Sequence, residues 1–138
     1  MNSDEDIVIT SAFRTPIGSF QGSLKDHKAT ELGTTVIKKC MDHSNLNGSE
    51  VETVILGQVL QAGCGQNPAR QAAINAGIDK DNTATTINQV CGSGLAAVTL
   101  AFNSLKLNDS NIVIAGGQES MTNAPHYLNY RMEKNLSD

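Results

Sequence analysis

Apolar, β-branched runs alternate along this chain with segments whose apolar residues recur at helical spacing, and this alternation limits the fold more than any other feature. The strand-like runs are residues 7–10, 54–60, 83–88 and 111–115. The helix-like segments are residues 28–43, 67–77 and 95–105. Strands that alternate with helices are typical of α/β folds, in which each helix crosses over to the next parallel strand. The order β-α-β-α-β-α-β therefore predicts a mostly parallel sheet with helices on both faces.

The alternation stops at Gly117. Residues 118–138 show no recognisable helix or strand pattern and end in polar residues. A length of 138 residues would suit one ordinary domain, but a domain rarely closes on such a tail. Charged residues are only 17% of the chain, against a usual share of about 25%, which favours a surface that another segment or partner covers. We therefore expect an incomplete half-domain over residues 1–117, followed by the truncated start of a loop region over residues 118–138.

Charge and hydropathy exclude several classes of protein. The net charge is −4 at pH 7 and Lys and Arg form no cluster, so the chain lacks the basic surface that nucleic acids require. No apolar run approaches the roughly 18 residues of a membrane span, and the acidic start does not resemble a signal peptide. The three cysteines have no metal-ligand spacing. We expect a cytoplasmic protein without a metal, and with no nucleic-acid or membrane partner.

One cysteine lies where chemistry is expected, between a strand and the helix that follows it. Cys91 is followed by Gly92 and Gly94, which let the backbone turn sharply and approach other groups closely. The helix that begins near Leu95 would place the cysteine at the positive end of its dipole, beside unpaired backbone N–H groups. Such a site favours a nucleophilic thiolate and can stabilise an oxyanion. These residues indicate acyl transfer through a thioester on Cys91.

Two other interpretations fit the same residues. A free cysteine is most often a buried, unreactive side chain. The segment from Gly92 to Ala97 also matches G-x-G-x-x-A, the dinucleotide-binding fingerprint, and Glu119 follows near the place of a ribose-binding acid. Against this second interpretation, the preceding strand is polar, and the motif comes third in the series whereas the fingerprint usually opens its domain. The residues alone leave all three interpretations open.

Five motifs occur in an order that is specific when they are taken together. They are Arg14–Phe20, Gly57–Gly63, Gly65–Gln71, Asn88–Gly94 and Ala115–Pro125. In these motifs the chain resembles the N-terminal portion of a thiolase of the acetyl-CoA acetyltransferase (acetoacetyl-CoA thiolase) type. The resemblance covers nearly the whole chain and implies a thiolase-like N-terminal α/β half-domain.

The resemblance also implies a ping-pong acyltransferase of fatty acid metabolism. Cys91 would attack an acyl-CoA thioester and hold the acetyl group, with the Cys91 backbone N–H contributing to an oxyanion hole. A second acetyl-CoA, deprotonated at its methyl carbon, would then attack and give acetoacetyl-CoA by Claisen condensation, and the reverse reaction is thiolytic cleavage. The coenzyme A thioester is a substrate, and no further cofactor is implied. Full-length members of the family are expected to be homo-oligomers, dimers or tetramers.

The chain departs from the family pattern chiefly in what it does not contain. Gln118 and Cys64 stand where the family more often has other residues, away from the expected chemistry. The family's acid/base cysteine, its Gly-His-Pro histidine, its Asn-Glu-Ala-Phe segment and most of its CoA-binding loop belong to a later part of the sequence. Two alternatives therefore stay open. One is a non-catalytic fragment or assembly module of a thiolase, and the other is a degradative 3-ketoacyl-CoA thiolase or ketoacyl synthase-type enzyme.

The remaining candidate side chains have plainer explanations. Cys40 lies on the apolar stripe of the first helix and is expected in the core. Cys64 is expected in a loop between two glycines, and Arg70 is expected to hold a loop or a neighbouring chain. His126 follows a proline close to the expected site, which makes it a hypothetical base for Cys91.

Overall fold

The computed structural model describes residues 6–128, which contain three longer helices, three strands and one short 3-10 helix. In chain order the elements are α1 (Ala29–Ser44), β1 (Thr53–Gly57), α2 (Pro68–Ala76), β2 (Thr83–Ile87), α3 (Ser93–Lys106), β3 (Val113–Gly117) and η1 (Met121–Asn123). The three expected helices and the last three expected strands are all present, with ends displaced by a few residues. None of the helices described is long and apolar enough to cross a membrane.

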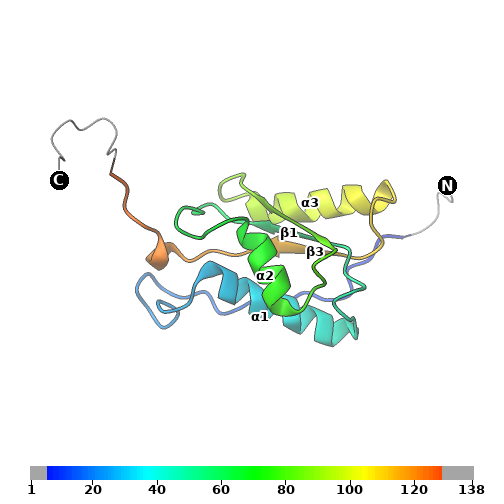
Figure 1. The fold of residues 1–138 in the computed structure, drawn as a ribbon, viewed down its shortest axis with the longest axis horizontal. Helices are drawn as coiled ribbons and strands as arrows, with labels where there is room; N and C mark the ends of the chain where they lie inside the picture. The colour runs from blue at the N-terminus through cyan, green and yellow to red at the C-terminus, as the bar shows by residue number, and fades with distance from the viewer. Residues whose placement is uncertain (1–5, 129–138) are drawn as a thin grey trace.

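The strands form one parallel sheet in the order β2-β1-β3. Parallel strands need crossover connections, and here α1 and α2 lie on one side of the sheet while α3 lies on the other (Figure 1). This arrangement confirms the predicted α/β fold, with parallel strands and helices on both faces. Because the strands run the same way, their last residues, Gly57, Ile87 and Gly117, share one edge of the sheet.

The central strand β1 is buried on both faces, as its nearly continuous apolar run predicts. Val54 and Leu56 pack with apolar side chains of α1 and α2 on one face of the sheet. Ile55 packs with Ala97 and Ala101 of α3 on the other face. Since neighbouring residues of a strand point to opposite faces, this one strand joins both halves of the core and fixes the position of its carboxyl end.

The prediction of a strand at residues 7–10 is wrong. This segment pairs with no strand in the described part of the chain, and its Val8 and Ile9 are 68% and 79% exposed. Residues of this segment line a groove together with residues 110–113. Thr10 instead forms a hydrogen bond to the last residue of α1, with an Oγ1–Oγ distance of 3.2 Å. The β-branched run has the propensity for a strand, but it lies against no sheet edge that could supply the hydrogen bonds.

Helix α3 turns its small residues toward the sheet rather than its large ones. Ala97 and Ala101 are buried, whereas Leu95 and Phe102 are 75% and 47% exposed. Because alanine side chains are short, the helix can pack closely on β1 and β3. The apolar stripe that marks this helix in the sequence therefore lies on the surface of the described part of the chain.

Glu52, just ahead of β1, is expected to make the fold sensitive to acid. Its carboxylate accepts hydrogen bonds from the side-chain amide of Asn111 at 2.9 Å and from the Asn111 backbone N–H at 3.0 Å. These bonds lower the pKa of the Glu52 carboxyl from its ordinary value of 4.5. A pKa that is lower in the folded state stabilises the fold above the ordinary value, and this contribution is lost as the pH falls through the lowered value.

We therefore expect the thermal midpoint of the wild-type chain to fall more than that of Glu52→Gln when the pH is lowered from about 7 to about 3. Melting curves followed by circular dichroism at both pH values measure the two differences. An equal fall in both proteins would show that the ionised Glu52 carboxyl contributes nothing.

Candidate active site

The sheet brings three loops together at its carboxyl edge. Residues 58–66 follow β1, residues 88–92 follow β2, and residues 118–124 follow β3. In open parallel sheets this is the edge at which ligands bind. Cys91 lies in the loop after β2, immediately before α3, and is exposed. Its expected position between a strand and a helix start is confirmed, and it is not a buried cysteine.

A strained turn carries Cys91. The preceding residue, Val90, has a φ of 51°, in the left-handed region that a β-branched residue rarely adopts. Asn88 Oδ1 accepts a hydrogen bond from the Val90 N–H at 2.9 Å. Ser93 Oγ accepts from the Gln89 N–H at 2.8 Å and donates to the Val90 carbonyl oxygen at 2.6 Å. Side chains before and after the turn therefore hold its backbone in a sparsely populated conformation.

The beginning of α3 lies directly against the sheet. A Cβ atom added to Gly57, the last residue of β1, would lie 2.5 Å from Ser93 Cβ and 2.9 Å from the Gly94 backbone nitrogen. A Cβ atom on Gly117, the last residue of β3, would lie 3.5 Å from Gly94 Cα. The missing side chain of Gly57 allows this close approach, whereas the distance at Gly117 is an ordinary contact. The position of Cys91 thus depends on the glycine at the end of β1.

Two side chains from the end of β3 hold the loop that follows β1. Gln118 Nε2 donates to Gln58 Oε1 at 2.8 Å, and both residues are buried. The Glu119 carboxylate accepts hydrogen bonds from the Val59 N–H at 2.8 Å and from the Leu60 N–H at 3.3 Å. The loops after β1 and β3 are therefore one connected unit.

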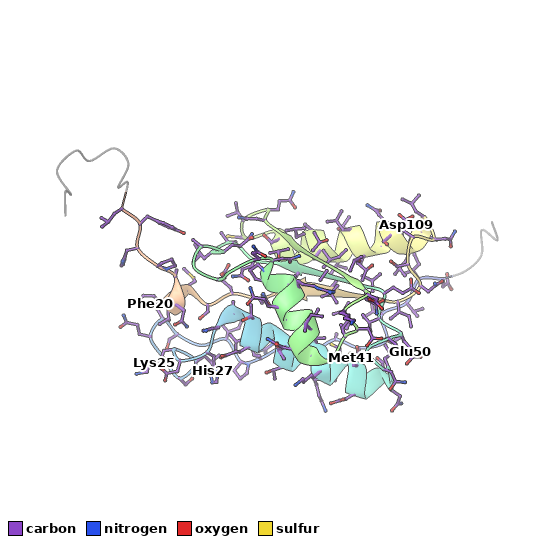
Figure 2. All side chains as sticks on the ribbon, in the orientation of Figure 1. Phe20, Lys25, His27, Met41, Glu50 and Asp109 are labelled. Carbon is purple, nitrogen blue, oxygen red and sulfur yellow. The ribbon has the colours of Figure 1, made fainter. Side chains whose placement is uncertain are left out.

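Ser120, just before η1, and Asn123, the last residue of η1, hold the loop that precedes α1. Ser120 Oγ donates to the His27 carbonyl oxygen at 2.9 Å. Asn123 Nδ2 donates to the carbonyl oxygens of Lys25 and His27, each at 2.9 Å. Figure 2 shows Lys25 and His27 in the loop ahead of α1. Loops far apart in the sequence thus meet at the same edge of the sheet as Cys91.

The structure also places three other side chains that the sequence singled out, Arg70, Cys64 and Cys40. The Arg70 guanidinium donates to the carbonyl oxygens of Lys80 and Asn82, so it holds the loop before β2, as one of its two expected roles requires. Cys64 Sγ accepts a hydrogen bond from a buried glutamine amide at 3.3 Å, beside a cavity of about 210 Å³ that Cys91 does not line. Cys40 is half-buried on α1.

The rival interpretations of this edge find less support. Glu119, the candidate ribose-binding acid, accepts hydrogen bonds from the backbone after β1. His126 is exposed and shares no hydrogen bond with Cys91 in the described part of the chain. Across residues 6–128, no group of at least three His, Cys, Asp or Glu side chains is placed to hold a metal ion.

Removal of the Glu119 carboxylate is expected to loosen the loop after β1. A hydrogen bond to a charged acceptor contributes about 1.5–3 kcal/mol, and the half-buried position of Glu119 reduces that value through solvent screening. We expect Glu119→Ala to lower the free energy of unfolding by about 1–2 kcal/mol. Denaturant titration measures the change, with Asp81→Ala as the control for an exposed carboxylate. A loss no larger than that of the control would mean that Glu119 does not hold the loop.

Sequence reasoning found the turn around Cys91 through its glycines, but it missed the contributions of Asn88 and Gly57. Asn88 accepts a hydrogen bond from the backbone two residues on, which is a turn signal that the sequence does carry. Gly57 carries no such local signal, because its contact with Ser93 joins the end of β1 to the start of α3.

Almost the whole chain matches a known protein family. A family model described as "Thiolase, N-terminal domain" matches residues 7–137. The chain is 52% identical to the probable acetyl-CoA acetyltransferase of Escherichia coli K12 over 124 residues. These residues cover 90% of this chain and 32% of that protein. It is 55% identical over 123 residues to the acetyl-CoA acetyltransferase of Cupriavidus necator, covering 89% and 31% respectively.

A further relative is the probable acetyl-CoA acyltransferase of Staphylococcus epidermidis. The identity is 53% over 122 residues, which cover 88% of this chain and 31% of that protein. The chain therefore spans about a third of the length of these curated relatives.

Proposed function

The chain belongs to the thiolase family, and on that premise we propose that Cys91 is the nucleophile of an acyl transfer from coenzyme A thioesters. The observation that carries the proposal is an exposed cysteine at the carboxyl edge of a parallel sheet, in a strained turn before a helix. This placement leaves the thiol open to substrate at the positive end of the helix dipole. The names of two relatives support acetyl as the transferred group.

In the first half-reaction, the Cys91 thiolate attacks the thioester carbonyl carbon. A new C–S bond forms to Cys91, the C–S bond to coenzyme A breaks, and coenzyme A leaves as a thiolate that takes up a proton. Negative charge gathers on the carbonyl oxygen between these events. The backbone N–H of Cys91 is the nearest donor by sequence for that oxyanion. Coenzyme A is thus a substrate, and the step as written uses no other cofactor.

In the second half-reaction, the methyl carbon of another acetyl-CoA loses a proton and attacks the acyl group on Cys91. The products are acetoacetyl-CoA and free Cys91, and coenzyme A cleaves acetoacetyl-CoA in the reverse direction. The family resemblance assigns the base that removes this proton to later segments of the family's sequence. The name of the Staphylococcus epidermidis relative, an acyltransferase, keeps longer 3-ketoacyl-CoA substrates as a second candidate class.

An assembly module is the second candidate function, and one observation favours it. Helix α3 exposes the apolar side chains of Leu95, Val98 and Phe102, at 75%, 40% and 47%. Apolar side chains that are exposed at helical spacing favour an interaction site on this helix. In this role the chain would pair with the remaining part of a thiolase and enter its homo-oligomer.

Isotope exchange tests the first half-reaction without the second. Acetyl-CoA and radiolabelled coenzyme A are incubated with the chain alone, and with the chain plus the separately expressed remainder of the Cupriavidus necator relative. A nucleophilic Cys91 predicts that the label enters acetyl-CoA in at least one of the two samples. Exchange in the mixed sample alone would support pairing as well, whereas no exchange in either sample would refute the nucleophile proposal.

A further inference from the structure

Ser93, the first residue of α3, is buried, and its hydroxyl is bonded to the turn that carries Cys91. Ser93 Oγ accepts from the Gln89 N–H at 2.8 Å and donates to the Val90 carbonyl oxygen at 2.6 Å. The Ser93 backbone N–H donates to the same oxygen at 3.1 Å. One residue therefore supplies two donors to the Val90 carbonyl oxygen and directs that oxygen toward the helix.

That carbonyl belongs to the peptide group that joins Val90 to Cys91. A trans peptide group is planar, and its C=O and N–H bonds point in opposite directions. Because the Val90 oxygen is directed toward Ser93, the Cys91 N–H is directed away from the start of α3. It therefore points away from the buried side of the turn and toward the side on which Cys91 is exposed.

The turn needs support to keep this orientation. Val90 has a φ of 51°, and a β-branched residue strongly prefers negative φ. If the backbone relaxed, the adjoining peptide groups would rotate with it. Asn88 Oδ1 holds the peptide group before Val90 through its N–H, at 2.9 Å, and Ser93 holds the one after it.

We propose that Ser93 is a positioning residue, whose hydroxyl holds the Val90–Cys91 peptide group so that the Cys91 N–H faces the oxyanion formed during acylation of Cys91. This inference rests on the proposed role of Cys91 as the nucleophile. Ser93 then does more than shape the turn, because the hydrogen bond that supports the strained backbone also orients an oxyanion donor.

Two reagents separate orientation of the N–H from reactivity of the thiol. p-Nitrophenyl acetate acylates a thiol through a tetrahedral oxyanion, whereas iodoacetamide alkylates it by direct displacement without one. Neither reagent needs a coenzyme A site. Peptide mapping measures both rates at Cys91, and the ratio of acylation to alkylation is compared between the wild type and Ser93→Ala. Since loss of an oxyanion donor slows acyl transfer by about 10²–10³-fold, we expect misdirection of this donor to lower the ratio about tenfold or more.

Two further variants make the comparison decisive. Thr99→Ala removes a hydroxyl that bonds to the Leu95 carbonyl oxygen at 3.2 Å on the exposed side of the same helix, and it should leave the ratio unchanged. Asn88→Ala changes an exposed residue on the other side of the turn and should lower the ratio about threefold, a milder form of the same misdirection.

An unchanged ratio in folded Ser93→Ala would overturn the positioning role. If Ser93→Ala does not fold, an unchanged ratio in Asn88→Ala would overturn it instead. Failure of the proposed function has a different signature, since wild-type Cys91 would then react with p-nitrophenyl acetate but support no exchange of coenzyme A in any sample.

Discussion

Cys91→Ala is expected to reduce coenzyme A exchange to the rate measured without protein, because no other group replaces the thiolate that carries the acyl group. The turn around Cys91 is held by Asn88 and Ser93 and not by the thiol. Cys91 is also exposed, so we expect the free energy of unfolding to stay within about 0.5 kcal/mol of the wild-type value. Exchange and denaturant unfolding are measured on the same preparation, under the condition in which the wild type exchanges.

The two other cysteines provide matched controls. Cys40 is half-buried on α1, and Cys64 lies in the loop after β1. Both Cys40→Ala and Cys64→Ala should retain exchange. If Cys64→Ala abolished exchange while Cys91→Ala retained it, the nucleophile would have been assigned to the wrong loop.

Gly57→Ala is expected to have the second-largest effect, although Gly57 takes no part in the chemistry. The new Cβ would lie 2.5 Å from Ser93 Cβ and 2.9 Å from the Gly94 nitrogen, so the start of α3 must move away from β1. Overpacking of this kind costs about 1–3 kcal/mol of unfolding free energy. Movement of the helix start also displaces Cys91, and we expect exchange to fall about tenfold or more. Denaturant titration and the exchange assay measure the two effects.

Gly116→Ala is the matched control on the neighbouring strand. A Cβ added at Gly116 would meet only Leu56 Cδ2, at 4.0 Å, which is an ordinary contact. We expect this variant to unfold within about 0.5 kcal/mol of the wild type and to retain exchange. If Gly57→Ala behaved in the same way, close approach at Gly57 would not be what positions α3.

Much of the fold could be predicted because its helices carry local signals. Asn67 caps α2 by accepting a hydrogen bond from the Arg70 N–H at 3.2 Å, and Gly77 ends the helix with a φ of 97°. The prediction of a strand at residues 7–10 was wrong because a strand also needs a neighbouring strand to pair with, and a local sequence pattern does not show whether one is present. The outward direction of Leu95 could not be predicted either, since helical spacing gives a stripe and not the surface that it covers.

The candidate site could be predicted only as far as its own loop. The glycines after Cys91 indicate a turn before a helix, and the structure contains that turn. The support from other strands is not local: Glu119 bonds to the Val59 N–H across 60 residues of sequence, and Gly57 lies against Ser93. These contacts exist because the order β2-β1-β3 brings the ends of all three strands to one edge. That strand order cannot be predicted from the sequence of any single segment.

Peptide mapping by mass spectrometry, after incubation with acetyl-CoA, tests the nucleophilic role of Cys91 most directly. The chain is incubated alone and together with the remainder of the Cupriavidus necator relative, and the acetylated peptides are identified before and after treatment with neutral hydroxylamine. We predict an acetyl group on Cys91 that hydroxylamine removes, as a thioester requires, and none on Cys40 or Cys64. Absence of the acetyl group from Cys91 in both samples, or a thioester on a different cysteine, would contradict the proposed role.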